Sequence, residues 1–385
     1  MHHLRVSKIA VRTLAAVRTL AAAALSATLA VALGAAALAP PSGGAEPGVV
    51  LTSASTPGPT ARAVRRLGTH WVRVFLLWRD FEPQRGVLSA EEFAAFDKLF
   101  SRLPPGTKVL ADVVDAPQWE TGSSNPNAPP ASDAEYGSFV QALARHFAGR
   151  VAAYEIWNEE DLPAWWVGAP DPTAYTALLR AAYPAIKAVE PKATVVLGGL
   201  AGNDYRFLEG VYAAGGKGYF DAVGVHTDTA CDVLSPYDYV RDANGRIDPD
   251  AFLGYREVHA TMLAHGEHKP IWMTELSWRT TRAVCGEGAF AGHKPEGVSD
   301  RRQAAYLLAG YHCLAQAPYV QVALWFDLKD EGSVLSGLMS ANGRPKPAFH
   351  AMREEARHGD RLRGSCGVDI GPPGHVHRRH HHRRR

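Results

Sequence analysis

Short apolar runs alternate with longer amphipathic segments along most of the chain. The apolar runs are rich in Val, Leu and Ile, and Val195-Val196-Leu197 is an example. Uninterrupted apolar runs are typical of parallel strands that are covered on both faces. The sequence predicts strands at residues 48–53, 70–77, 107–114, 151–157, 193–199, 220–226, 269–275 and 320–326.

The segments between these strands have helical periodicity. They span residues 60–67, 90–102, 134–147, 173–189, 205–214, 251–265 and 300–315. Ser132 and Asp133 are suited to cap the third of these helices, and Ser299 and Asp300 the seventh. About eight strand–helix units in roughly 310 residues predict a single-domain (β/α)₈ barrel, the TIM barrel. A doubly wound open sheet is the alternative, but no GxGxxG follows the first strand and no P-loop lysine is present, so nucleotide binding lacks support.

Composition and charge divide the 385 residues into three segments. The 46% of hydrophobic and 21% of charged residues are typical of a globular chain and exclude a collagen, a coiled coil and a disordered protein. Residues 1–45 hold four basic residues and no acid, and residues 358–385 hold seven Arg and two Asp. The whole chain has a formal net charge of +2, so the body at residues 46–357 carries a net charge of −7. This balance gives no reason to expect a nucleic-acid partner.

The N-terminal segment, residues 1–45, has the pattern of a secretory signal peptide with a short linker. Basic residues from Arg5 to Arg18 precede an uncharged run rich in Ala and Leu at residues 20–39. An uncleaved anchor is the alternative, since about 20 apolar residues can span a bilayer. Ala is only weakly hydrophobic, so we favour cleavage. In both cases the body is expected to be secreted or held at the cell surface.

The C-terminal segment, residues 358–385, loses the helical and strand periodicity. Gly, Pro, His and Arg dominate it, so it is predicted to be a disordered tail. A solvated tail is the preferred interpretation, and electrostatic contact with an anionic cell surface is the alternative.

Four cysteines become candidates for disulfide bonds in an exported protein. Cys231 and Cys285 fall in long stretches after strands that should be neighbours, so they are predicted to pair. Cys313 lies in an apolar helix and is expected as a buried thiol, with a bond to Cys366 as the alternative. No CxxC spacing and no clear His/Asp/Glu ligand spacing is present, so neither a catalytic metal nor a cofactor is expected.

Polar and aromatic side chains gather where the predicted strands end, which is where the active site of such a barrel lies. Seven of the nine Trp fall there. Aromatic faces pack on the apolar faces of sugars, and carboxylates and amides bind hydroxyls, so the set predicts a carbohydrate site. The alternative is that these aromatic residues fill the loops over the barrel mouth. The candidate residues are Trp78, Trp119, Asn158, Glu159, His226, Glu275, Trp278 and Trp325.

Two carboxyl groups are needed to cleave a glycosidic bond, and in a retaining enzyme they stand ~5–5.5 Å apart. Glu159 and Glu275 are the pair in place, at the ends of the fourth and seventh predicted strands. Their repulsion and burial are expected to raise the pKa of one of them. Glu155 points into the barrel by its parity, where we expect it to pair with Arg73. The sequence has no Gly-x-Ser-x-Gly motif, so hydrolysis by a serine nucleophile is not supported.

These segments resemble known motifs. Glu155-Ile156-Trp157-Asn158-Glu159 is similar to the acid/base motif of clan A glycoside hydrolases, and Trp272-Met273-Thr274-Glu275 to their nucleophile segment. Val72-Arg73-Val74, with Trp78 and residues 82–86, resembles their second strand. Trp325 and residues 337–348 resemble the closing strand and last helix. The resemblance covers about residues 65–355 and is nearest to glycoside hydrolase family 39 and its cellulase-like relatives.

The resemblance implies a role for each matching residue. Glu159 would be the acid/base and Glu275 the nucleophile, while Asn158 would bind the sugar 2-hydroxyl. It also implies that Arg73 orients Glu275, that His226 contacts the nucleophile region and that Trp325 forms the floor of the sugar subsite.

The sequence departs from the family pattern in two places. Glu160 stands where relatives commonly have Pro, which could alter the pKa of Glu159 or exchange the role of proton donor. Thr227-Asp228 stands where they often show Pro-Tyr, which weakens any transfer of substrate identity.

The leading hypothesis is a secreted, monomeric, retaining glycosidase acting on a poly- or oligosaccharide. A catalytically silent carbohydrate-binding barrel and a transglycosylase are the alternatives, and the unusual Glu160 and Asp228 keep the silent barrel open as a hypothesis. The acidic body argues against a strongly anionic polysaccharide, unless Arg73, Arg279 and Arg282 offset the field locally.

Overall fold

A computed structural model describes residues 44–227, 231, 235–286, 291–292 and 295–370. Residues 1–43 of the predicted signal and linker segment, Asp228 and residues 371–385 lie outside this part of the chain. In the described ranges no helix combines the length and the apolar character that crossing a bilayer requires.

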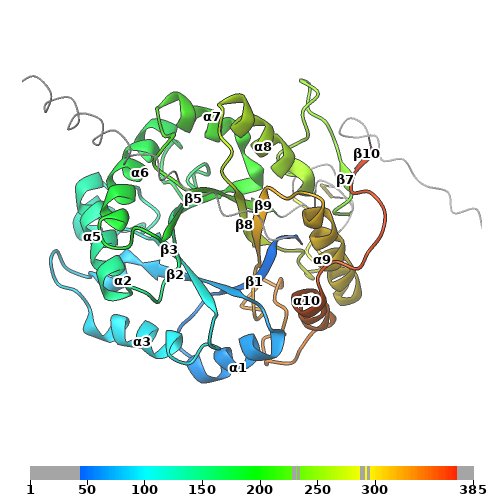
Figure 1. Ribbon diagram of the computed structural model, residues 1–385, viewed down its shortest axis with the longest axis horizontal. Coiled ribbons are helices and arrows are strands. Elements are labelled where there is room, and N and C mark those ends of the chain that lie inside the picture. The colour runs from blue at the N-terminus through cyan, green and yellow to red at the C-terminus, as the bar shows by residue number, and fades with distance from the viewer. Residues whose placement is uncertain (1–43, 228–230, 232–234, 287–290, 293–294, 371–385) are drawn as a thin grey trace, which may run out of the picture. The chain divides into compact units, whose positions relative to one another are not determined.

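Eight parallel strands close into a barrel in the order β1-β2-β3-β4-β5-β6-β8-β9 (Figure 1). Each overlaps a strand expected from the sequence, so the predicted (β/α)₈ barrel is confirmed. The alternative of an open, doubly wound sheet is excluded because β9 pairs with β1. The strands are β1 Glu46–Leu51, β2 Trp71–Leu77, β3 Lys108–Val114, β4 Ala153–Asn158, β5 Thr194–Leu200, β6 Ala222–Thr227, β8 Ile271–Leu276 and β9 Val320–Trp325.

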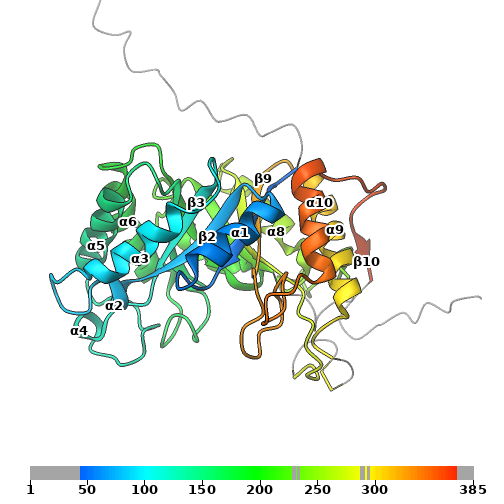
Figure 2. The same ribbon diagram turned by 90° about the horizontal axis from the view of Figure 1, so that it is seen from below.

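In the described part of the chain, eight longer helices surround the barrel of strands (Figure 1 and Figure 2). The predicted caps are present: the Ser132 hydroxyl accepts from the Glu135 amide, and the Ser299 hydroxyl from the Arg302 amide. The long helices are α1 Pro57–Leu67, α3 Ala90–Phe100, α5 Asp133–His146, α6 Pro172–Lys187, α7 Tyr205–Ala213, α8 Tyr255–Ala264, α9 Asp300–Ala315 and α10 Pro347–His358. Short turns of helix are α2 Trp78–Phe81, α4 Gln118–Thr121, η1 Ala201–Asn203 and η2 Phe252–Gly254.

The inside of the barrel changes character along β2. Trp71 belongs to an apolar cluster with Trp272, whose ring centroid lies 4.9 Å away, and this cluster fills one end of the barrel. Arg73 is the next residue of the same parity and is fully buried among carboxylates. Phe75 follows and lines a cavity at the C-terminal ends of the strands. The alternation of a strand therefore builds an apolar plug, a charged layer and an aromatic mouth in sequence.

The chain beyond α10 is tied to the body. Strand β10, Val368–Asp369, pairs in parallel with β7, Asp238–Tyr239. Asp360 accepts a 2.8 Å hydrogen bond from His312, and Cys366 forms a disulfide bond with Cys313. The prediction of a disordered tail is therefore wrong for residues 358–370, because a cross-link and a strand pair hold them.

Both disulfide bonds of the structure join distant parts of the chain. One links Cys231 to Cys285, the pair expected from the sequence. The other links Cys313 to Cys366, so the expectation that Cys313 is a buried free thiol is wrong. Nothing in the periodicity around Cys366 indicates that this segment returns to α9.

Candidate active site

Arg73 is the centre of the charged layer and has no exposed surface. Its Nε donates to Glu155 at 2.6 Å, its Nη1 to Glu275 at 2.7 Å, and its Nη2 to Asp112 and to the Asn158 side-chain oxygen, both at 2.9 Å. The expected pairing of Glu155 with Arg73 is confirmed. One guanidinium thus orients side chains from β3, β4 and β8.

The charge of Arg73 is maintained by its acidic neighbours. Burial lowers the pKa of an arginine, but Glu155, Asp112 and Glu275 together raise the pKa of Arg73 above its ordinary value. The layer therefore holds a permanent cation beneath the cavity.

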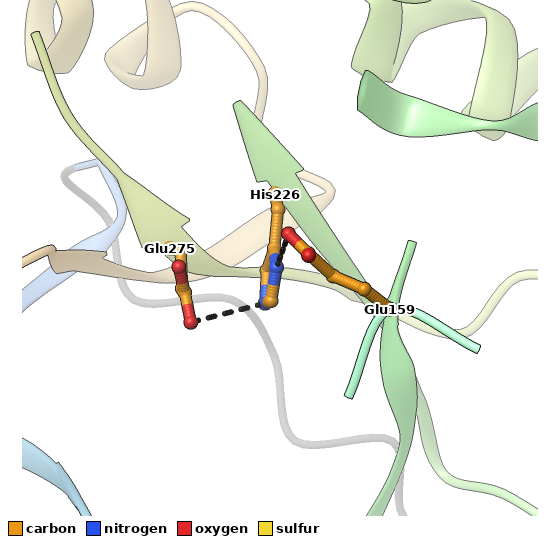
Figure 3. A group of neighbouring side chains, drawn as sticks. All are labelled: Glu159, His226 and Glu275. Carbon is orange, nitrogen blue, oxygen red and sulfur yellow. Dashed lines mark hydrogen bonds and ion pairs between the residues drawn. The ribbon is translucent and has the colours of Figure 1, made fainter. Parts of the chain in front are cut away.

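Glu159, His226 and Glu275 meet above this layer, and Figure 3 shows His226 between the two carboxyl groups. His226 Nδ1 lies 2.9 Å from Glu159 Oε1, and Nε2 lies 3.8 Å from Glu275 Oε1. One oxygen of each carboxyl group lies within 4.8 Å of the other. Burial lowers the pKa of His226, but Glu275 and Glu159 outweigh it and the net shift is upward. Burial raises the pKa of Glu275, while His226 and Arg73 oppose that rise.

Two adjacent glycines of β5 make room for side chains on opposite faces of the sheet. A Cβ at Gly199 would collide with the His226 ring, and a Cβ at Gly198 would collide with the Glu160 carboxyl group. Gly199 is therefore a condition for the position of His226.

Glu160 lies in the interior rather than in the cavity. It is fully buried, and neither of its oxygens has a hydrogen-bond partner among the described residues. Burial, reinforced by Asp161, raises the pKa of Glu160 well above its ordinary value. Glu160 is buried and does not line the cavity, which does not support an exchange of the donor role from Glu159 to Glu160.

The backbone at the end of β4 is strained. Trp157 and Glu159, which flank Asn158, have φ angles of 70° and 48°. A residue with a side chain adopts this left-handed region at a cost of about 1–3 kcal/mol, and such strain is concentrated at functional sites. The strain therefore marks the Asn158-Glu159 pair independently of its sequence motif.

A cavity of about 280 Å³ opens above the carboxyl groups. Asn158, Glu159 and Glu275 line it together with the aromatic rings of Phe75, Trp165 and Phe326. The inward direction of Phe75 could be predicted from the sequence, because Phe75 lies two residues after Arg73 on the same strand and shares its parity. Trp165 and Phe326 lie beyond their strands, where alternation no longer fixes direction.

The tryptophans predicted to contact a sugar lie elsewhere. Trp78 and Trp325 are 0% exposed and Trp278 is 1% exposed. Trp78 stacks on Phe139, Trp278 packs on Phe252, and the Trp325 indole donates to the Ser336 carbonyl. These rings turn into the layer between barrel and helices, so they present no surface to the cavity. The alternative that large aromatic residues fill the structure is the better interpretation for these three.

Trp119 is half-buried and does not line the cavity either. Its ring packs edge-on against Trp78, and its indole N–H donates to the Glu82 carbonyl. The guanidinium of Arg85 lies over its face. Trp119 therefore organises the loops beside the site.

Glu159, His226 and Glu275 also have the donor atoms of a metal site. Two observations oppose that use. Glu275 Oε1 already accepts from Arg73, so a metal ion there would lie beside a guanidinium. His226 Nδ1 is already engaged with Glu159. The three residues belong to three different strand ends, so no ligand spacing in the sequence indicates them. Their hydrogen bonds fit proton transfer and nucleophilic attack better than coordination of a metal ion.

Replacing Asp327 by Asn is expected to change the pH dependence of stability. Burial, with Glu331 and Asp330, raises the pKa of Asp327 to about 8. The folded protein then keeps a proton that the unfolded chain loses above about pH 4, so stability should fall from about pH 4 to pH 8. Asp327→Asn should raise the Tm by roughly 2–4 °C at pH 8 and by less at pH 5. Calorimetry at both values checks this, and an equal change at pH 5 and pH 8 contradicts it.

No family model and no curated protein matches the sequence. Solved structures do match. A family 39 glycoside hydrolase from the gut symbiont Bacteroides cellulosilyticus WH2 has a TM-score of 0.64 and 22% identity over 86% of this chain and 69% of that chain. A monomeric β-xylosidase from Caulobacter crescentus CB15 has a TM-score of 0.58 and 20% identity over 81% of this chain and 68% of that chain. GH5_18 from Streptomyces cattleya in complex with GlcNAc has a TM-score of 0.61 and 17% identity over 86% of this chain and 86% of that chain.

The structural neighbours thus include glycoside hydrolases of families 39 and 5, and a likeness to family 39 is what the sequence motifs lead one to expect. At these identities the likeness establishes the fold.

Proposed function

We propose that this chain is a glycosidase that hydrolyses O-glycosidic bonds with retention, using Glu275 as nucleophile and Glu159 as acid/base. The observation that carries the proposal is the approach of the two carboxyl groups, whose oxygens lie within 4.8 Å. Carboxyl groups ~5–5.5 Å apart are typical of retaining enzymes, whereas inverting enzymes need ~6.5–9.5 Å to admit a water molecule.

In the first step Glu275 attacks the anomeric carbon, the bond to the leaving oxygen breaks, and Glu159 gives that oxygen its proton. Arg73 binds Glu275 Oε1, which leaves Oε2 for the attack. His226 Nδ1 binds Glu159 Oε1, which leaves Oε2 to carry the proton. In the second step water attacks the glycosyl ester and gives its proton to Glu159, which restores both carboxyl groups.

The remaining residues of the site serve this chemistry. Asn158 is oriented by Arg73 and is proposed to bind the hydroxyl next to the anomeric carbon. Phe75, Trp165 and Phe326 supply the aromatic surface for the apolar faces of the sugar. The neighbours in fold, among them a β-xylosidase and an exo-β-1,4-mannosidase, support a carbohydrate as substrate class.

The chain is further proposed to be exported through residues 1–45 and to act outside the cell as a monomer. Two disulfide bonds support an oxidising location. For the basic C-terminal residues a solvated tail is the preferred hypothesis, and contact with an anionic surface is the alternative.

Glu159→Gln is expected to slow hydrolysis according to the leaving group. For an alkyl glycoside, whose leaving oxygen needs a proton, kcat/KM should fall about 10²–10⁴-fold. For a dinitrophenyl glycoside, whose leaving group departs as the anion, the first step should be nearly unaffected. Steady-state and burst kinetics on both substrates measure this. Equal losses on the two would contradict the acid role, and a wild type inert on every glycoside would favour a silent binding barrel.

Gly199→Ala is expected to displace His226 and to lower kcat/KM by roughly 10²-fold, the usual effect of a misplacement of about 1 Å. The reason is the collision of the new Cβ with the His226 ring. Because the collision is with that ring, Gly199→Ala combined with His226→Ala should be no worse than His226→Ala alone. Additive losses in this cycle would place the effect of Gly199 elsewhere.

A further inference from the structure

The cavity at the carboxyl groups continues on the side of β1 and β2. A second cavity of about 350 Å³ shares Thr52, Phe75 and Leu77 with it. The second cavity reaches between the end of β1 and helix α3, where Ala95 and Phe96 line it. Ligand sites typically occupy about 300–1,000 Å³, so the two cavities together have room for more than the first alone.

Hydroxyl and carboxyl groups line the second cavity. Thr52, Ser53 and Ser55 supply hydroxyls from the loop after β1, and Asp80 and Glu92 supply carboxyl groups. The hydroxyls can donate to and accept from sugar hydroxyls, and the carboxylates can accept from them. Phe96 and Val74 also line the second cavity and add apolar surface.

The charge of the second cavity restricts its ligand. Its lining contains Asp80 and Glu92 and no Lys, Arg or His. Arg79 approaches Asp80 at 3.6 Å but does not line the cavity. An anionic sugar would therefore meet carboxylates, whereas a neutral sugar or an amino sugar would not be repelled.

The position of Glu159 sets the direction of the chain that is cleaved. The proton donor must lie beside the leaving group, and Trp165, 38% exposed in the loop that follows Glu159, borders the cavity at that end. The second cavity lies at β1 and β2, whereas Glu159 follows β4, and β3 lies between β2 and β4. The leaving group and the second cavity are therefore on different sides of the attacked sugar.

We infer that the second cavity is a sugar-binding subsite that holds a neutral or amino sugar joined to the attacked unit on the side away from the cleaved bond. This inference rests on the proposed function. It makes the substrate an oligosaccharide with at least two units before the cleaved bond. A third cavity of about 340 Å³ shares Leu51, Thr52, Ser53 and Ser55 with the second and continues the path.

The test compares nitrophenyl glycosides of one sugar and of its disaccharide. The wild type is expected to show at least a tenfold higher kcat/KM on the disaccharide glycoside. Ser53→Phe, at an exposed position, and Ala95→Phe, on α3, each narrow the second cavity and should bring that ratio close to one. Ser138→Phe is the matched control, because Ser138 is exposed on α5 and lines none of the three cavities.

A wild-type ratio near one, or a preference that survives both Phe variants, overturns the inference while leaving the proposed function intact. If the wild type hydrolyses neither glycoside, the proposed function fails, and calorimetric titration with the free mono- and disaccharide decides the inference. Tighter binding of the disaccharide that is lost in both Phe variants supports it, and equal or absent binding overturns it.

Discussion

Glu275→Gln is expected to lower kcat for aryl glycosides by at least about 10⁴-fold, because an amide oxygen cannot form the glycosyl ester through which both steps proceed. Gln keeps the size of Glu and can still accept from Arg73, so the geometry of the site should be retained. The loss should be similar for good and poor leaving groups, unlike the loss in Glu159→Gln. Steady-state kinetics with a dinitrophenyl and an alkyl glycoside measure both.

Glu190→Gln is the matched control for Glu275→Gln, since Glu190 accepts from the Gly149 amide far from the cavity. It should leave kcat unchanged. If Glu275→Gln kept a tenth or more of the wild-type kcat while folded, as judged by its unfolding transition, Glu275 would not be the nucleophile.

Arg73→Met is expected to lower the free energy of unfolding by about 3–5 kcal/mol, the usual cost of leaving buried partners without their counter-charge. Arg73 has no exposed surface and donates to Asp112, Glu155, Glu275 and Asn158. Met fills a similar volume but leaves these oxygens unpaired. Urea unfolding of wild type and variant measures the change.

Two further variants separate this effect from the loss of any arginine. Arg85→Met removes an ion pair with Glu135 and the contact of the guanidinium with the Trp119 ring, at a side chain that is 61% exposed, and should cost only about 1 kcal/mol. Adding Asp112→Asn to Arg73→Met should recover part of the stability, because one buried acid is then neutral. A loss below about 1 kcal/mol for Arg73→Met would show that the charged layer is not held by this guanidinium.

The barrel and its charged residues follow from rules that act along single strands. Alternation places Arg73, Glu155 and Phe75 inside, and the common polarity of parallel strands brings Glu159, His226 and Glu275 to one end. These are short-range properties of the backbone. That is why a sequence without a matching family model still indicated the two carboxyl groups.

The side chains that follow a strand are governed by tertiary packing instead. Trp278 lies two residues beyond β8 and turns into the helix layer, while Phe326 follows β9 directly and faces the cavity. Both residues are large aromatic side chains just after the end of a strand, so the sequence does not distinguish their directions. Cys366 likewise returns to α9 only through the folded body, so its bond to Cys313 carries no local signal. The outcome in each case depends on which neighbour offers a space to fill.

The most direct test of the proposed function is to trap the glycosyl-enzyme. The chain is incubated with a panel of 2-deoxy-2-fluoro sugars that carry dinitrophenyl leaving groups, and the intact mass and the labelled peptide are determined. The account predicts one sugar per chain, attached to the peptide that contains Glu275, with a stoichiometric burst of dinitrophenol. Turnover of the parent glycosides without an adduct on Glu275, or a label on another carboxyl group, would contradict it.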